Sequence, residues 1–276
     1  TSQAVLAREA AYLQEAGEDD AARRVFAEAK RIQPETALDY YLLAENLRVR
    51  GRFNEALGFY LKAQQLSPDH YWVQHFLGLC YRNLGQHAAA ASGFSSCIAR
   101  RPDYAWAYVL RGICSAELGQ FDNADADFDK AEQLDPTLFS VFVSRGVVLL
   151  TQRKFDEALV NLEKARELKP DSGKPLVNIA AAYWALAEQL QKSDNLDEQA
   201  IDRPASADLE LVQRVQGLYD KALAALAQAA ESGAGNHPGL HQLRGQILER
   251  RGQTEAALIS YRRHLEVDSN ADRKAF

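Results

Sequence analysis

Residues 71–102 read YWVQHFLGLCYRNLGQHAAAASGFSSCIARRP, and the pattern of this stretch recurs along the chain at a step of 34 residues. The step is marked by five evenly spaced prolines: Pro34, Pro68, Pro102, Pro136 and Pro170. A fixed period of this length is typical of repeats that stack on one another, each burying its apolar face against its neighbours. We therefore expect one elongated array with a thin, continuous core.

Each repeat is predicted to be a pair of helices. In the second half of the unit, apolar residues at i, i+4 and i+7 form one helical face, as in Ala90, Phe94 and Cys97. An i, i+3, i+4, i+7 face precedes it, as in Tyr40, Leu43, Ala44 and Leu47. A small residue such as Gly78 is predicted to face the repeat alanine of the second helix, so that the two helices approach closely.

The ends of the helices are also marked in the sequence. Glycine separates the two helices, because it readily adopts the left-handed conformation that ends a helix, at Gly17, Gly51, Gly85 and Gly119. The fifth unit has Arg153 at this position, where a left-handed conformation would cost about 1–2 kcal/mol. Proline disfavours helical geometry in the residue before it and so ends the second helix. The aspartates that follow prolines are predicted to cap the next helix: Asp69, Asp103 and Asp171.

These residues resemble the tetratricopeptide-repeat family, whose pattern is matched in order by Leu77, Gly78, Tyr81, Ala90, Phe94 and Pro102. The resemblance covers nearly the whole chain and implies an all-α fold, a right-handed superhelix of about seven helical hairpins. We expect a single solenoid domain, 1–276, with repeats at about 3–36, 37–70, 71–104, 105–138, 139–172, 173–237 and 238–271.

The sixth repeat contains an insertion at about 188–217. The first helix of this repeat is expected to run on to about Asn195. A polar loop follows, and Ser206 and Asp208 are expected to cap a long helix that continues to about Glu231. Two interpretations remain open: an insertion tolerated at a loop, or an arm that covers the groove or contacts a second protein.

In the family, first helices line the inner, concave surface, so the resemblance implies a groove built from first-helix side chains. The predicted groove residues are mostly apolar: Tyr41, Arg48, Trp72, His75, Arg82, Trp106, Val109, Ile113, Val143, Val147, Leu150, Lys174, Val177, Asn178 and Trp184. A solvated wall should be polar, so this stripe needs an explanation. Three remain open: the neighbouring repeat buries part of it, the insertion or another copy fills it, or a helix or extended segment of a partner binds there.

The family's best-known binding site, a clamp for a C-terminal carboxylate, is not expected here. The clamp needs lysine, asparagine and arginine spread over three first helices. Lys174 and Asn178 each match one slot but share a single repeat, and the corresponding slots elsewhere hold Leu42, Phe76, Leu110 and Ser144. A role in binding the tails of Hsp70 or Hsp90 is therefore not predicted.

Composition argues against several other classes of function. The net charge is −6 and no basic stripe is present, so nucleic acid is not expected as a ligand. No apolar run approaches membrane-spanning length and no signal peptide is visible, so we expect a cytoplasmic protein. The sequence contains no methionine, which favours an excised or processed segment.

No catalytic residue, cofactor or metal site is predicted. Cys80, Cys97 and Cys114 lack the spacing of zinc ligands, and we interpret them as buried packing residues in a reducing compartment. Asp125, Asp127 and Asp129 imitate the start of a calcium loop, but Lys130 stands where the glycine is needed. We interpret these aspartates as a solvated helix face. Arg111 and Arg145 share one repeat position and are assigned to repeat-to-repeat contacts.

The sequence predicts a non-catalytic scaffold that binds a peptide or protein segment in its groove, as part of a larger bacterial signalling or assembly protein. The alternative is a self-assembling structural domain, in which the apolar wall or an end repeat contacts another copy. Arrays need polar end units for solubility. The C-terminal stretch after Tyr261 is charged and is expected to cap one end, while Ala4, Ala7 and Ala11 give no sign of a binding site at the N-terminal wall.

Overall fold

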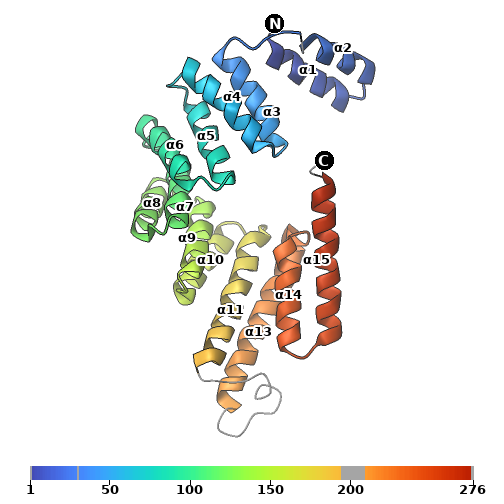
Figure 1. The fold of residues 1–276 in the computed structure, drawn as a ribbon. Helices are drawn as coiled ribbons and strands as arrows, with labels where there is room; N and C mark the ends of the chain where they lie inside the picture. The colour runs from blue at the N-terminus through green and yellow to red at the C-terminus, as the bar shows by residue number, and fades with distance from the viewer. Residues whose placement is uncertain (1, 30, 194–208, 275–276) are drawn as a thin grey trace. The chain divides into compact units, whose positions relative to one another are not determined.

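The computed structural model describes residues 2–29, 31–193 and 209–274, and every regular element in these ranges is helical (Figure 1). The helices pair into hairpins. Contacts between residues divide the chain into two compact units, residues 1–134 and 135–276. None of the described helices combines the length and the hydropathy needed to cross a membrane. The predicted single solenoid domain stays a prediction.

Each helix of unit 1 packs against the other member of its hairpin, first helix against second. The hairpins are α1 (Gln3–Glu15) with α2 (Asp19–Ala29), α3 (Ala37–Val49) with α4 (Phe53–Leu66), α5 (Tyr71–Asn83) with α6 (His87–Arg100), and α7 (Ala105–Glu117) with α8 (Phe121–Leu134). In addition, α4 packs on α5 and α6 packs on α7, which joins successive hairpins.

Unit 2 contains longer helices. Its hairpins are α9 (Phe139–Thr151) with α10 (Phe155–Leu168), α11 (Gly173–Ser193) with α13 (Leu209–Ala229), and α14 (Pro238–Arg250) with α15 (Thr254–Lys274). A kinked turn, η1 (Ala230–Ala234), follows α13, and its backbone is non-helical at Ser232 and Gly233. The first helix of the sixth repeat does run on, to Ser193, and its partner begins at Leu209; the predicted caps Ser206 and Asp208 lie outside the described residues.

The turns inside the hairpins have the predicted left-handed backbone. Gly51, Gly85 and Gly119 have φ angles of 74°, 72° and 73°. Arg153 occupies the same place between α9 and α10 with φ 62°, and in the described residues no other non-glycine has a positive φ. The left-handed conformation expected at Arg153 is therefore confirmed, and this conformation is the source of the predicted strain.

Replacing Arg153 with glycine should stabilise unit 2. Glycine adopts a positive φ without a steric penalty but loses more entropy on folding, so we expect a net gain of about 1 kcal/mol in the free energy of unfolding. Urea denaturation followed by circular dichroism measures it. The matched control is Arg153→Ala, which removes the guanidinium 5.8 Å from the Phe155 ring but keeps the strain. Equal stabilities for the glycine and alanine variants would contradict the strain argument.

Within the hairpins, glycine allows an aromatic ring of the second helix to lie against the first. A Cβ atom added to Gly78 would lie 2.7 Å from Cε1 of Phe94, and one added to Gly112 would lie 2.9 Å from Cε1 of Phe128. A Cβ on Gly93 would lie 3.3 Å from the Gly78 Cα, so α5 and α6 approach closely as predicted. The ring four residues after the repeat alanine covers the glycine, and the repeat alanine also lies close by: the added Cβ at Gly112 would lie 3.2 Å from the carbonyl oxygen of Ala124.

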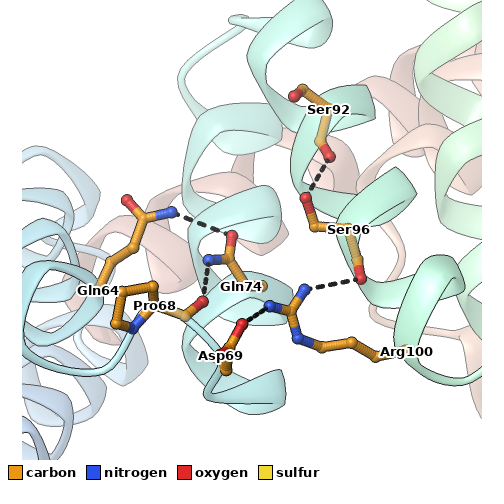
Figure 2. Close-up of polar contacts among 7 residues, drawn as sticks. All are labelled: Gln64, Pro68, Asp69, Gln74, Ser92, Ser96 and Arg100. Atoms are coloured by element: carbon orange, nitrogen blue, oxygen red, sulfur yellow. Dashed lines mark hydrogen bonds and ion pairs between the residues drawn. The ribbon is translucent and has the colours of Figure 1, made fainter.

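Polar side chains connect the second hairpin of unit 1 to the third (Figure 2). The Gln64 Nε2 on α4 donates to Oε1 of Gln74 on α5 at 3.1 Å, and Nε2 of Gln74 donates to the carbonyl of Pro68 at 3.0 Å. Asp69 forms an ion pair with Arg100 of α6. Pro68 and Asp69, in the turn before α5, are thus held by side chains of α5 and α6.

Asp69 does not cap α5. The N-cap residue is His70, whose Nδ1 accepts a hydrogen bond from the Val73 amide at 3.3 Å, while Asp69 is held by Arg100. At α7 the N-cap is Tyr104, with no capping hydrogen bond from its side chain. The capping roles predicted for Asp69 and Asp103 were therefore wrong, and that of Asp171 stays a prediction.

Candidate functional site

The most exposed aromatic residue among those predicted for the groove is Trp72, on α5. Its side chain is 42% exposed. The indole stacks on the Phe76 ring with centroids 6.0 Å apart, and it meets the Tyr71 ring edge-on at 5.1 Å. Because rings contact it on two sides, the exposed indole is held in place rather than free to rotate.

Phe76 joins Trp72 to two predicted residues of α3. The Tyr41 ring centroid lies 6.0 Å from that of Phe76, and the Arg48 guanidinium lies 4.7 Å from the Phe76 centroid. We call Tyr41, Arg48, Trp72 and Phe76 the aromatic surface. The repeat pattern indicated only a clamp slot for Phe76 and did not predict its place in this surface. The signal for that place is its spacing of four residues from Trp72 on one helix.

Arg48 is fixed by groups behind it. Its Nε and Nη2 donate to the two carboxylate oxygens of Glu45 at 2.7 and 3.1 Å, and the buried Tyr60 hydroxyl also donates to Glu45. Partial burial alone would raise the pKa of Glu45, but these hydrogen bonds outweigh it and lower the pKa. The carboxylate is therefore ionised at neutral pH and holds the guanidinium over Phe76.

His75 supports Trp72 from inside the fold. It is buried, its ring stacks with Tyr71 at 6.2 Å and meets Trp72 edge-on at 5.6 Å, and Phe94 packs against it at 6.1 Å. Burial, with the nearby Arg48 and Arg82 charges, lowers the pKa of His75 to about 4. At neutral pH the imidazole is therefore uncharged and acts as a packing group.

Two further predicted groove residues are also buried: Val109 on α7 and Val177 on α11. Together with His75, they pack inside their own unit rather than exposing a contact surface. Burial within the repeat fold therefore explains why these three positions of the predicted groove do not carry solvated polar side chains.

The other predicted residues of unit 1 lie beside different neighbours. Trp106 on α7 is half-buried and packs against a cluster formed by Ala90, Phe94, Leu110 and Cys114. Arg82 and Ile113 are half-buried. Trp106 therefore has a structural role that Trp72 lacks.

In unit 2, the predicted residues come from α9 and α11. Val147 is exposed, Val143 is half-buried, and Leu150 and Trp184 pack against the main cluster of that unit. The Asn178 side chain donates to the Lys174 carbonyl at 3.2 Å, one turn back on the same helix. Of the residues predicted for the groove in unit 2, only Val147 and Lys174 are exposed.

Comparisons with known proteins agree with the repeat pattern. Residues 76–138 and 211–272 match the family model described as Tetratricopeptide repeat. These two segments are therefore similar to tetratricopeptide repeats in sequence, and together they make up somewhat less than half of the chain. No functionally curated protein matches the sequence.

Solved structures with the same fold include a tetratricopeptide repeat protein from Parabacteroides merdae, 17% identical with a TM-score of 0.69 over 96% of this chain and 93% of that one. A monomeric mutant of IFIT1 with Gppp-AAAA is 14% identical, with a TM-score of 0.68 over 93% and 58%. Yeast Tom70 is 16% identical, with a TM-score of 0.63 over 96% of this chain and 50% of Tom70. At these identities the likeness shows the fold, and the predicted all-α fold of tetratricopeptide-repeat hairpins is confirmed.

The three cysteines, Cys80, Cys97 and Cys114, are buried and form no disulfide. Burial raises the pKa of each thiol to about 11, so the thiols are protonated at neutral pH. Within the described residues, no group of three or more His, Cys, Asp or Glu side chains is arranged to hold a metal ion. Asp127 of the calcium-like run is buried and paired with Arg111, so it is not part of a solvated face.

The first repeat contains a hollow that the repeat pattern does not predict. A groove of about 490 Å³ lies between α1 and α3. A second hollow of about 540 Å³ continues along α1 and shares Arg8, Tyr12 and Leu42 with the first. Ala7 and Ala11 line this groove, because their small side chains leave space that Tyr12 and Leu42 border.

Proposed function

We propose that the chain is a non-catalytic scaffold that binds a peptide or protein segment on the aromatic surface of α3 and α5. The match to tetratricopeptide repeats and the repeat fold support this, because that fold generally mediates interactions between proteins. Binding on the unit 2 residues, and a place in a larger bacterial signalling or assembly protein, stay predictions.

The observation that carries the proposal is the exposure of Trp72 on a rigid support. A large apolar side chain in water gains free energy when a partner covers it, and tryptophan is enriched among residues that dominate binding affinity. Since Phe76 and Tyr71 already fix the indole, little side-chain entropy is lost on binding. A partner residue with an apolar or aromatic side chain would fit this contact.

Arg48 adds a polar contact next to the indole. Its side chain is 26% exposed, and two hydrogen bonds to Glu45 leave part of the guanidinium free to donate to a carbonyl or carboxylate of the partner. A bound segment that combines an apolar anchor with a nearby acceptor would satisfy both groups. The surface thus favours a protein segment over a purely apolar or purely charged ligand.

Truncating Trp72 should abolish most partner binding without unfolding the protein. We expect Trp72→Ala to reduce partner capture at least tenfold, because removal of an interface anchor commonly costs more than about 1.4 kcal/mol. Chemical crosslinking in native lysate, followed by quantitative mass spectrometry of the captured proteins, measures the effect.

The matched control is Leu118→Ala. Leu118 lies in the same unit and is 41% exposed, against 42% for Trp72, but it is outside the aromatic surface. Capture should stay at the wild-type level in this variant, and both variants should keep wild-type helical content by circular dichroism. Undiminished capture by Trp72→Ala, or an equal loss in both variants, would reject the aromatic surface as the binding site.

A further inference from the structure

Arg48 and Arg82 occupy the same repeat position on successive first helices, α3 and α5, 34 residues apart. Both side chains are half-buried. Arg48 is paired with Glu45, which also accepts a hydrogen bond from the Tyr60 hydroxyl. The Arg82 guanidinium forms neither an ion pair nor a hydrogen bond with any residue that the structure describes. Its charge is therefore unbalanced, although its position in the repeat is the same.

The missing counter-charge of Arg82 follows from two differences between the second and third hairpins. The repeat positions that hold Glu45 and Tyr60 in the second hairpin hold Leu79 and Phe94 in the third. Neither leucine nor phenylalanine can accept a hydrogen bond from a guanidinium, and a guanidinium stays charged at physiological pH. The third hairpin thus keeps the basic residue of this repeat position without its acidic partner.

Arg82 lies on the face of α5 that carries Trp72. His75 follows Trp72 by three residues and Arg82 follows His75 by seven, which is the spacing of one helical face. The His75 ring meets the Trp72 indole edge-on at 5.6 Å. Burial and the Arg48 charge lower the pKa of His75, and the Arg82 charge lowers it further, so the guanidinium lies near this imidazole. The unbalanced charge is therefore a neighbour of the aromatic surface.

The adjacent first helix, α7, supplies no counter-charge either. Burial raises the pKa of the Cys114 thiol on α7 and the Arg82 charge acts in the opposite direction, so the guanidinium also lies near this helix. Glu117, three residues later on α7, is exposed, and no ion pair joins it to Arg82 in the described part of the chain. The helices that carry these neighbours thus leave the guanidinium without a carboxylate.

We propose that Arg82 binds the side-chain carboxylate of an aspartate or glutamate within the partner segment, beside the apolar anchor that covers Trp72. This inference rests on the proposed binding of a segment at the aromatic surface and specifies the chemistry of that segment. A guanidinium and a carboxylate form paired, charge-assisted hydrogen bonds, which are stronger where water is partly excluded. Arg48 has no such preference for an acidic residue, because Glu45 already balances its charge.

The separation of Trp72 and Arg82 sets the spacing of the two contacts. The residues are 10 positions apart on α5, which is about 15 Å along the helix axis. An extended segment spans this distance in about 4–5 residues. Since the net charge of the chain is −6, its overall charge does not attract acidic segments, and a preference for them has to come from this local group.

Selection from a library of random peptides tests the proposal. Peptides displayed on phage with their carboxyl ends fused to the coat protein present no free terminal carboxylate, so only side chains can pair with Arg82. Selection on the wild-type chain should enrich peptides that carry an aromatic or aliphatic residue and an acidic residue about 4–5 positions away. Fluorescence anisotropy with labelled, amidated copies of these peptides then measures affinity. Exchange of the acidic residue for its amide should weaken binding at least about tenfold.

Arg82→Met completes a double-mutant cycle with the peptide exchange. The variant keeps an unbranched apolar side chain and removes the charge, so the acidic peptide and its amide analogue should bind it equally. A purely structural role of Arg82 would weaken both peptides alike and keep their difference. Arg24→Met is the control, because Arg24 is exposed on α2 and also has no ion pair among the described residues, and it should bind like the wild type. The peptide exchange changes nothing in the protein, so it tests the proposal even if Arg82→Met disturbs the fold.

Trp72→Ala distinguishes failure of this inference from failure of the proposed function. Peptides that lose affinity for Trp72→Ala but carry no acidic residue at this spacing would overturn the role of Arg82 and leave the aromatic surface as the binding site. A preference for the acidic peptide that persists in Arg82→Met, or an equal loss in Arg24→Met, would do the same. Failure to enrich any peptide, or selected peptides that bind Trp72→Ala as tightly as the wild type, would reject the proposed function and this inference with it.

Discussion

Replacing Arg111 with alanine is expected to lower the free energy of unfolding by about 3 kcal/mol. The guanidinium donates from Nε and Nη2 to both oxygens of Asp127 at 2.9 and 2.6 Å, and from Nη1 to the Ser95 hydroxyl at 3.2 Å. The Asp127 side chain is only 8% exposed, so the substitution leaves a buried carboxylate without its counter-charge. Urea denaturation of the whole chain, followed by circular dichroism and tryptophan fluorescence, measures the loss.

The double variant Arg111→Met/Asp127→Leu separates charge from packing. Apolar residues of similar size fill the space and remove both charges, so we expect stability within about 1 kcal/mol of the wild type. If the double variant is as unstable as Arg111→Ala, lost packing rather than an unpaired charge causes the effect. A loss of under 1 kcal/mol in Arg111→Ala itself would show that solvent screens the pair.

The repeat pattern predicts one contact of Arg111 correctly and misses its stronger one. The prediction that it makes a repeat-to-repeat contact is confirmed by its hydrogen bond to Ser95, which lies on α6 of the preceding hairpin. Its stronger partner, Asp127, was read as part of a solvated acidic face. Helical periodicity predicts which face of α8 carries Asp127. Whether that face is buried depends on how α7 packs against it, and the period alone does not show this.

Turns and helix pairs were the most predictable parts of the fold, because their causes are local. A backbone with positive φ requires glycine or accepts strain, and the sequence marks Gly85, Gly119 and Arg153 directly. Helix capping was less predictable, although it is also local. Asp69 has the right chemistry for a cap, but Arg100, 31 residues later, binds its carboxylate, and His70 caps α5 instead.

The sequence predicts which helix faces carry the residues of the candidate site, but it does not predict which of those residues are exposed. The repeat pattern places Trp72, His75 and Val109 on first helices, yet only Trp72 is exposed to any large degree. His75 lies one turn from Trp72 and is covered by Phe94 and Tyr71. Exposure depends on which rings of the paired second helix and of neighbouring turns reach over each position, and a period alone carries no information about that.

A comparison of Phe94 with Phe26 tests whether tertiary packing, rather than repeat position, decides how deeply a side chain is buried. Both occupy the aromatic position four residues after the repeat alanine, but Phe94 is fully buried and Phe26 is 41% exposed. We expect Phe94→Ala to lower the free energy of unfolding by about 3–5 kcal/mol, because it leaves a cavity above Gly78, whose backbone the ring contacts. Phe26→Ala should cost about 1 kcal/mol or less, since much of that ring is already in water.

Denaturant midpoints for the two alanine variants measure this difference directly. The residue types, the substitution and the repeat position are the same, so a difference of about 2 kcal/mol or more can come only from how the neighbouring helices cover each ring. Equal losses would mean that the first hairpin buries its core as tightly as the third. The hollow between α1 and α3, which Phe26 helps to line, would then close in solution.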